Sequence, residues 1–518
     1  MLDELQDDAR RLFPDAKNPP GGRRQHTPFL LVCEPSFVPV PPRAPRRRVR
    51  ALPPRLPSAT LRNRTSVRSA SDHPGRYRTA LPSINLPTTR EEAQTGDGSA
   101  HAVGIMVYVR QRNLPGLREY KYSSVDRSLV SKYILKPFYT NVVIKCFPLS
   151  MAPNLITLTG FMFVVANFLT LLWYNPGLDQ DCPSWVYYSW ALGLFLYQTF
   201  DAVDGTQARR TKQSGPLGEL FDHGVDALNT SLEVLLFAAS QNLGQGWKTV
   251  ATLFAALLTF YVQTWDEYHT KTLTLGIVNG PVEGILILVA VYTLTGFFGG
   301  AHIWQQSMLR TLGVPHALGI PAALYDLSFT EWYMVQGGIV LVLNTVESSL
   351  NVIRARHGRG DRSRGALLGL LPFFAVWALV VAYLFLQPNI LHHHLVPFVL
   401  FAGLINAYSV GQIITAHLVT MRFPYWNVLG LPLAFGVIDS LGPYLQQRFG
   451  FGWPSALGDG VYQVAFLFLM LGTALGVYGS FVVDVIITIC DYLDIWCLTI
   501  KHPYNEGHNL SNGKTKNY

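Results

Sequence analysis

The sequence has few charged residues and few cysteines. Only 14% of its 518 residues are Asp, Glu, Lys or Arg, whereas a soluble protein has about 25%. The chain therefore lacks the polar surface that would let water surround it, which argues against a soluble enzyme or a nucleic-acid module. Its five cysteines show no CxxC spacing and no metal pattern, so a disulfide framework is not expected.

The sequence instead contains long runs of apolar residues. Several exceed the roughly 18–20 residues that cross a bilayer core. We predict an all-α fold, a polytopic membrane protein with about ten transmembrane helices and an N-terminal interfacial amphipathic helix after a disordered leader. The predicted spans are residues 155–174, 184–203, 217–240, 248–264, 274–299, 331–349, 366–386, 395–418, 424–445 and 462–486.

Basic residues in the connections orient these spans. With a cytosolic N-terminus, thirteen basic residues fall in cytosolic connections and the C-terminal tail, and three fall on the opposite side. This bias follows the positive-inside rule and predicts that both termini are cytosolic.

The chain divides by composition. Residues 1–105 hold 15 of the 33 prolines, and their 17 Lys and Arg against 10 Asp and Glu give +7 of the net +8. We predict a disordered Pro/Arg-rich leader there; alternatives are a basic tether to anionic lipid and a start of translation at Met106. Beyond it we expect an interfacial segment (106–150), catalytic helices (151–299), further transmembrane helices for lipid access or dimer packing (300–500) and a cytosolic tail (501–518).

The stretch from Ser124 to Phe147 mixes basic and apolar residues. This pattern predicts an amphipathic helix that lies on the membrane before the first span, and Pro137 would end or kink it.

The densest group of charges lies between the second and third spans. Asp201 and Asp204 are three residues apart, and Asp222 and Asp226 are four apart, so each pair shares one face of its helix. Two antiparallel helices joined by a short basic loop would bring the four carboxylates together. Four converging negative charges repel, and hard oxygen ligands at this density suit Mg²⁺ or Mn²⁺, with two ions expected.

Small and basic residues flank these aspartates. Gly205 and Gly218 allow a ligand to approach the backbone closely, Ala208 leaves the adjoining face open, and the Arg209 guanidinium suits a phosphate. Together with metal ions, they indicate a substrate that contains a pyrophosphate.

The pattern D-x2-DG-x2-AR-x8-G-x3-D-x3-D, from Asp201 to Asp226, resembles the signature of the class-I CDP-alcohol phosphotransferases at all eight positions. The segments 152–157, 265–270, 279–284 and 490–493 resemble the eukaryotic (fungal-like) choline/ethanolamine phosphotransferase branch of this family. The resemblance covers roughly residues 106–500.

This resemblance implies transfer of phosphocholine or phosphoethanolamine from its CDP ester to diacylglycerol, giving a phospholipid and CMP. Asp201, Asp204, Asp222 and Asp226 would then hold the metal ions. The nucleotide pocket would contain Gly205, Ala208, Arg209, Gly218 and, from span one, Asn154.

Two residues compete as the general base that deprotonates diacylglycerol. Asp226 is the usual candidate of the family, although metal ions would neutralise it. Glu219 and His223 are four residues apart beside the aspartate face, and a carboxylate that orients the imidazole would favour His223 as the base. A purely structural His223 is the alternative.

Other questions stay open at the level of sequence. A transporter is the rival class, but transporters usually show repeated halves with broken helices; a different acceptor alcohol is the rival enzyme. We expect a homodimer, because Gly403 and Ala407 permit close helix packing. Lys514 and Lys516 form a KxKxx retrieval signal, which predicts the endoplasmic reticulum or Golgi membrane with the active site facing the cytosol. The preference for choline or ethanolamine is not decided.

Overall fold

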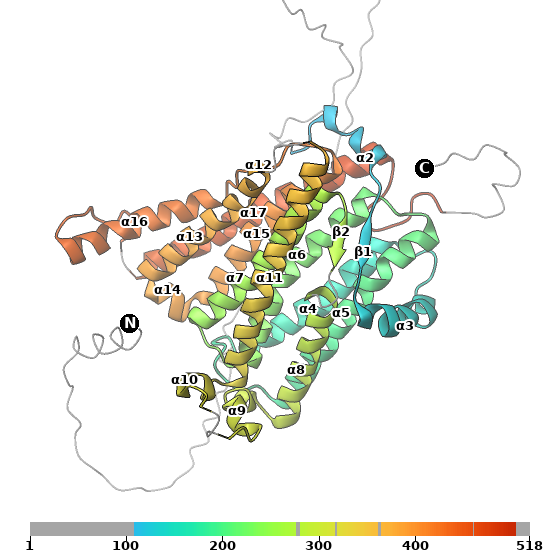
Figure 1. Cartoon of the computed structure of the whole chain (residues 1–518). Helices are drawn as coiled ribbons and strands as arrows, with labels where there is room; N and C mark the ends of the chain where they lie inside the picture. Colours follow the sequence, from blue (N-terminus) through green and yellow to red (C-terminus); the bar gives the residue numbers. More distant parts are fainter. Residues whose placement is uncertain (1–107, 276–279, 316–318, 361–363, 459, 504–518) are drawn as a thin grey trace, which may run out of the picture. The chain divides into compact units, whose positions relative to one another are not determined.

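The structure, a computed structural model, consists almost entirely of helices and describes residues 108–275, 280–315, 319–360, 364–458 and 460–503. A helix coincides with each predicted span (Figure 1). In chain order these are α4 (Pro153–Tyr174), α5 (Ser184–Thr211), α6 (Pro216–Ser240), α7 (Trp247–Thr270), α8 (Ile285–Phe298), α11 (Phe329–Gly358), α13 (Leu371–Leu386), α15 (Leu395–Leu418), α16 (Gly430–Phe449) and α17 (Val461–Leu493). The predicted leader and the KxKxx signal lie outside the described residues.

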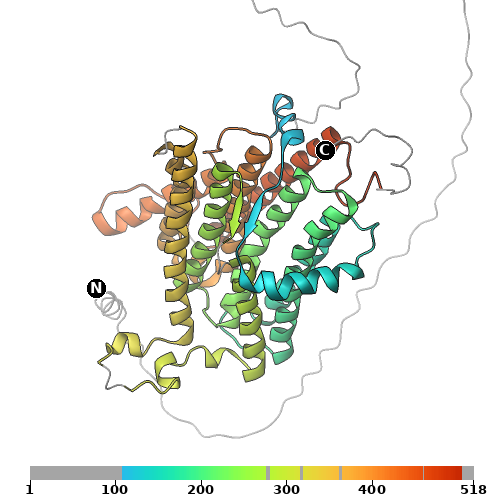
Figure 2. The same cartoon turned by 45° about the vertical axis from the view of Figure 1, so that its right-hand side comes forward.

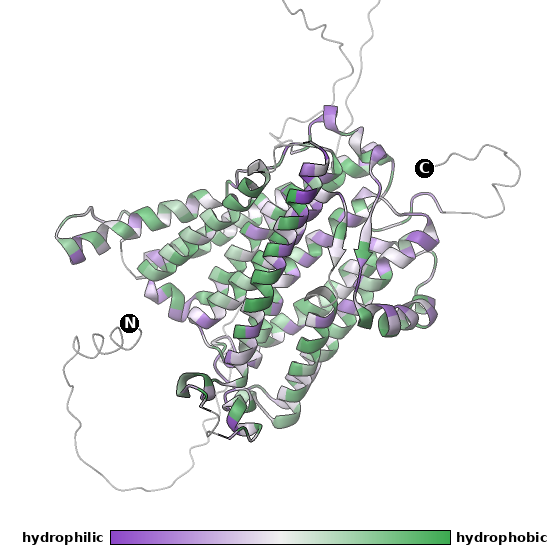
Figure 3. Cartoon of the chain, viewed as in Figure 1, coloured by the Kyte–Doolittle hydropathy of each residue, from purple (hydrophilic) through white to green (hydrophobic). Residues whose placement is uncertain are grey.

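Four helical segments among the described residues are long and apolar enough to cross a bilayer, namely α4, Gly365–Leu386, α15 and α17. The remaining long helices are more polar, and α5 and α6 contain the aspartates of the motif. Apolar residues nevertheless extend along most of the helices, as Figure 3 shows. The prediction of an all-α polytopic membrane protein is confirmed.

The segment before α4 differs from the single amphipathic helix that we predicted. Strand β1 (Ser124–Asp126) pairs in parallel with β2 (Leu273–Leu275). Helical structure then continues through a π-helical turn, η2 (Ser131–Leu135), into α3 (Lys136–Asn141). Pro137 does not end this helix, although it lies inside the continuous helical run. It is the second residue of α3, directly after the π-helical turn, and proline and π-helical turns both interrupt the regular α-helical hydrogen bonds. The segment crosses the long helices at a steep angle (Figures 1 and 2).

Short elements complete the fold. They are η1 (Gln111–Asn113), α2 (Gly116–Glu119), η3 (Val143–Cys146), η4 (Gly280–Gly284), η5 (Ala301–Ile303), α9 (Met308–Thr311), α10 (Ala322–Tyr325), α12 (Arg364–Leu367), η7 (Leu368–Leu370) and α14 (Pro388–His393).

The helix of the predicted span 274–299 begins later than expected, because strand β2 occupies the start of this range and the π-helical turn η4 precedes α8.

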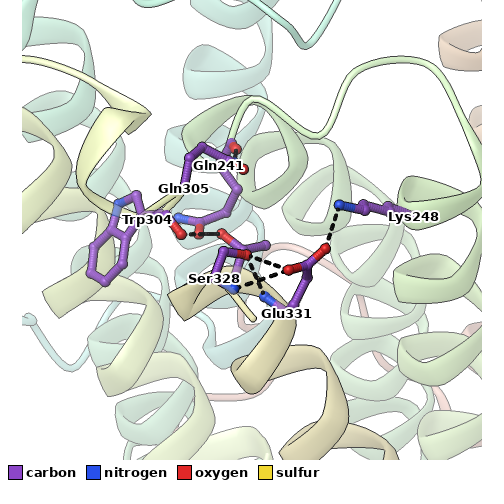
Figure 4. Close-up of polar contacts among 7 residues, drawn as sticks. Gln241, Lys248, Trp304, Gln305, Ser328 and Glu331 are labelled. Carbon is purple, nitrogen blue, oxygen red and sulfur yellow. Dashed lines mark hydrogen bonds and ion pairs between the residues drawn. The ribbon is translucent and has the colours of Figure 1, made fainter. Parts of the chain in front are cut away.

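A polar network joins the first turn of α11 to the connection between α6 and α7 (Figure 4). The Ser328 side chain accepts a hydrogen bond from the Glu331 backbone N–H, and the Glu331 carboxylate accepts one from the Ser328 N–H. Glu331 also pairs with Lys248 at 3.0 Å, while Thr330 Oγ1 donates to Gln241 Oε1 at 2.8 Å. Such reciprocal capping satisfies two backbone donors and fixes where α11 begins.

Helix α15 lies at the centre of the packing, against α6, α7 and α17. Gly403 and Ala407 belong to its buried face: Ala407 is 1% exposed, and a Cβ atom at Gly403 would lie 2.1 Å from Ser231 Oγ on α6. Their close packing is therefore within one chain. The expectation that Gly403 and Ala407 contribute to a dimer contact is wrong.

We predict that Gly403→Ala destabilises the protein. The added methyl group would overlap the Ser231 side chain, and overpacking of this kind costs about 1–3 kcal/mol. The measurement is thermal unfolding of the purified protein in detergent. Gly337→Ala on α11 is the matched control, because a Cβ there meets nothing within 4 Å. Equal melting temperatures of the two variants would contradict the packing described for α15.

Candidate metal and phosphotransfer site

Helices α5 and α6 form a hairpin that carries the aspartate motif. Helix α5 continues past the predicted end of its span and stops at Thr211, where Lys212 adopts a left-handed conformation with φ 57°. Helix α6 begins at Pro216, a residue that fits the first turn because its missing N–H is not needed there. The short connection makes the helices neighbours, so the last turns of α5 lie beside the first turns of α6.

Three of the four aspartates converge. One carboxylate oxygen from each of Asp201, Asp204 and Asp222 lies within 4.8 Å of the other two. Asp226, one turn further along α6, lies outside this group, and Tyr197 OH donates a hydrogen bond to its Oδ1. The structure therefore brings three of the expected metal ligands together directly and gives the fourth a hydroxyl partner.

The hydrogen bonds of these carboxylates are incomplete. Thr157 of α4 donates its hydroxyl to Asp204 Oδ2. Oδ1 of Asp201 and Oδ1 of Asp222 are buried, and neither has a hydrogen-bond partner among the described residues. A buried carboxylate oxygen without a donor is costly, and adjacent like charges add to that cost. Hard oxygen ligands in this arrangement fit a divalent cation such as Mg²⁺ or Mn²⁺.

The small residues of the motif leave space beside the carboxylates. A Cβ atom at Gly205 would have Arg209 Nη1 as its nearest neighbour, at 3.7 Å, and one at Gly218 would have Asn154 Oδ1 at 4.0 Å. Ala208, which lies between them in the sequence, is half-buried. No neighbouring side chain in the described part of the chain closes off either glycine, so a ligand can approach the backbone at both positions.

Arg209 and Asn154 border that space in different ways. Arg209 is exposed and donates from Nη2 to Thr206 Oγ1 at 3.0 Å. Asn154 is buried, and its Nδ2 donates to the backbone oxygen of Cys497 at 3.1 Å. The guanidinium therefore keeps donors for a phosphate, whereas the amide of Asn154 also ties the start of α4 to the segment after α17.

A second group of ionisable side chains contains Glu219, His223 and Glu267, each with an atom within 4.8 Å of the other two. His223 Nδ1 lies 3.8 Å from Glu267 Oε2, and both carboxylate oxygens of Glu219 are buried without a partner among the described residues. Glu219 and His223 thus lie together as their spacing predicted. The prediction from sequence did not include the second acid of this group, Glu267 of α7. An acidic residue just beyond the fourth predicted span was the feature that could have indicated it.

Comparisons with known proteins agree with this geometry. Residues 150–314 match the family model for CDP-alcohol phosphatidyltransferases. The chain is 40% identical over 403 residues to choline/ethanolaminephosphotransferase 1 of Saccharomyces cerevisiae, which covers 76% of this chain and 98% of that protein. It is 36% identical over 402 residues to choline/ethanolaminephosphotransferase 2 of Arabidopsis thaliana, covering 76% and 99%.

A third relative is an uncharacterized CDP-alcohol phosphatidyltransferase class-I family protein of Schizosaccharomyces pombe, 42% identical over 399 residues, covering 76% of this chain and 97% of that protein. The region matched by the family model includes α4 to α6, the helices that position the aspartates. The chain is therefore a member of the CDP-alcohol phosphatidyltransferase family, as its aspartate motif indicated.

Proposed function

We propose that the protein transfers phosphocholine, phosphoethanolamine or both from the CDP ester to 1,2-diacylglycerol, giving phosphatidylcholine or phosphatidylethanolamine and CMP. The observation that carries the proposal is the convergence of Asp201, Asp204 and Asp222, in a chain whose relatives are named choline/ethanolaminephosphotransferases over nearly their whole length. Three carboxylates and an exposed arginine suit a diphosphate, which a CDP ester contains.

The aspartates are proposed to hold Mg²⁺ or Mn²⁺, with two ions. Asp201, Asp204 and Asp222 supply the converging oxygens, and Asp226 keeps Oδ2 for a ligand while Tyr197 holds its Oδ1. A bound divalent ion neutralises the diphosphate and makes CMP a better leaving group. Around it, Gly205, Ala208, Arg209, Gly218 and Asn154 are proposed to form the nucleotide pocket.

The acceptor hydroxyl has to lose a proton as its oxygen attacks the β-phosphorus. We propose His223 as the base, oriented by Glu219 and Glu267, because two carboxylates adjoin its ring and a carboxylate partner raises imidazole basicity. Asp226 is the other candidate, but Tyr197 already donates to it. The new oxygen–phosphorus bond forms as the bond from phosphorus to CMP breaks, and Arg209 stabilises the developing phosphate charge.

A competition assay tests the function. Purified protein receives diacylglycerol, Mg²⁺ and equal amounts of labelled CDP-choline and CDP-ethanolamine, and each phospholipid is measured. We expect at least one phospholipid together with CMP, and the ratio gives the headgroup preference. Absence of product from both donors would refute the proposal.

The same assay examines the metal site. A chelator should abolish transfer and added Mg²⁺ or Mn²⁺ should restore it, whereas Asp222→Asn should stay inactive after the metal is returned. Full turnover of a rigorously chelated sample would refute the metal part.

We predict that His223→Ala lowers the transfer rate by roughly 10²–10⁴-fold, the usual contribution of general base catalysis. Affinity for the CDP ester should survive, because the nucleotide pocket lies on other residues; calorimetric titration measures it. Glu267→Gln should show a smaller loss, since it only orients the ring. Simultaneous loss of turnover and affinity would indicate a structural role for His223, and retained turnover would move the base to Asp226.

The location and orientation of the protein are also proposed. The positive-inside bias supports an active site on the cytosolic face, because Asp201–Asp204 and the start of α6 flank the basic connection at residues 209–212. The tail signal at Lys514 and Lys516 favours the endoplasmic reticulum or Golgi membrane. Epitope tagging of the tail with selective permeabilisation would report the side on which it lies.

We propose a homodimer whose contact does not involve Gly403. Gly472 and Gly476 on α17 are exposed, and a Cβ atom at either meets nothing within 4 Å; this spacing permits close approach of two membrane helices. We predict a dimer in mass photometry, and a shift to monomer in Gly472→Leu/Gly476→Leu. Gly337→Leu on α11, equally open, should leave the dimer intact. Monomers alone at every concentration of the unaltered protein would contradict the proposal.

A further inference from the structure

A cavity separate from the aspartate site lies where the ends of α7 and α11 meet the connection between α15 and α16. Its volume is about 480 Å³, within the range of small-ligand sites. Four cationic side chains line it, from three different elements: Lys271, Arg356, Arg359 and Arg422. Aromatic rings, together with Thr420 and Met421, form the rest of its wall, and none of the described residues that line it is acidic.

Among the described residues, no carboxylate pairs with these four cations. No ion pair within 4.0 Å joins any of them to an acid in the described part of the chain. Nε of Arg356 is buried and unpartnered there. Burial lowers the pKa of Lys271, and the neighbouring charge of Arg359 lowers it further, although Glu267 and Glu219 act in the opposite direction. The cavity therefore concentrates positive charge that an anion would neutralise.

The walls of the cavity are held in place by contacts between helices. Arg359 donates to the backbone oxygen of His269, and Tyr268 OH donates to the backbone oxygen of Met421 at 2.7 Å. The His269 ring stacks on Phe423 with an interplanar angle of 12°. These contacts tie α7 to α11 and to the 419–429 connection, so the three elements that carry the cationic side chains are held next to one another.

The surroundings of the cavity point to a lipid as the source of the anion. Tyr425 lines the cavity and is 47% exposed, and the next residue, Trp426, is 88% exposed. Tyr and Trp are enriched at the level of the lipid headgroups. The proposed orientation puts these helix ends on the cytosolic side, where anionic lipids attract basic residues.

We propose that this cavity binds the phosphate headgroup of an anionic phospholipid from the cytosolic leaflet, with Arg356 and Arg422 as its main phosphate donors. The site is distinct from the substrate site, although both adjoin the last turn of α7. Glu267 faces His223, whereas His269, two residues further on, and Lys271, about one turn further on, line the cavity. Occupancy of the cavity would thus stabilise the helix end that supports the proposed base.

Native mass spectrometry of the purified full-length protein tests the proposal with dioctanoyl phosphatidic acid as the probe and dioctanoyl phosphatidylcholine as the zwitterionic comparison. We expect the anionic lipid to bind about tenfold more tightly, and Arg356→Gln/Arg422→Gln to lose about tenfold in affinity, as expected when charge-assisted hydrogen bonds are removed. Neither side chain makes a hydrogen bond to the rest of the described chain, so the double variant should fold.

Arg354→Gln/Lys121→Gln is the matched control. It removes the same charge from exposed residues that do not line the cavity, and it should keep wild-type affinity within about twofold. An equal loss of affinity for phosphatidic acid in both variants would show that only the net charge of the protein matters, and would overturn the proposal. Equal binding of the two lipids by the unaltered protein would overturn it even if the variants failed to fold.

Inorganic phosphate separates the two possible sources of the anion. If the cavity recognises a lipid, phosphate at the concentration of the probe should not displace phosphatidic acid, because the acyl chains contribute to binding. Displacement by phosphate alone would show a site for a soluble anion and would overturn the assignment to a lipid.

Discussion

Mutual repulsion of buried carboxylates is the constraint on which the rest of this structure depends. Asp201, Asp204 and Asp222 lie within a few ångströms of one another, where water is scarce and like charges interact strongly. Thr157 donates its hydroxyl to Asp204, and the Gly205 backbone N–H also donates to that carboxylate. Asp201 Oδ1 and Asp222 Oδ1 are buried and accept no hydrogen bond from the described chain, so the cluster is suited to bind divalent ions that also contact a diphosphate.

The packing of the helices explains how such a site is maintained. Helix α4 lies against both α5 and α6 and brings Thr157 to the aspartates. Helix α15 lies on the other side of α6, so close that Gly403 leaves no room for a side chain. Close van der Waals packing of α15 against its neighbours stabilises the helices around the charged cluster, and the capping network at the start of α11 fixes the opposite end of α7.

Helix α7 connects the different polar regions of the molecule. Its last turns carry Glu267, which faces His223, and His269, which stacks on Phe423 beside the basic cavity. Residues two apart on a helix point about 200° apart, so one turn can serve two sites on opposite sides. The proposed base His223 and the proposed lipid cavity therefore adjoin the same end of α7, but they contact different side chains of that helix.

The sequence alone determined the helical membrane fold, the family and the pairing of residues along each helix. Apolar runs are long enough to specify helices locally, and the spacing of Asp201 with Asp204, or Glu219 with His223, fixes a shared face through helical periodicity. Tertiary structure alone decided which side chains from different helices meet. It matched Tyr197 with Asp226, brought Glu267 to His223 and turned Gly403 inward against Ser231. Periodicity specifies the faces of one helix but not the rotation of its neighbours, which depends on how all the side chains pack.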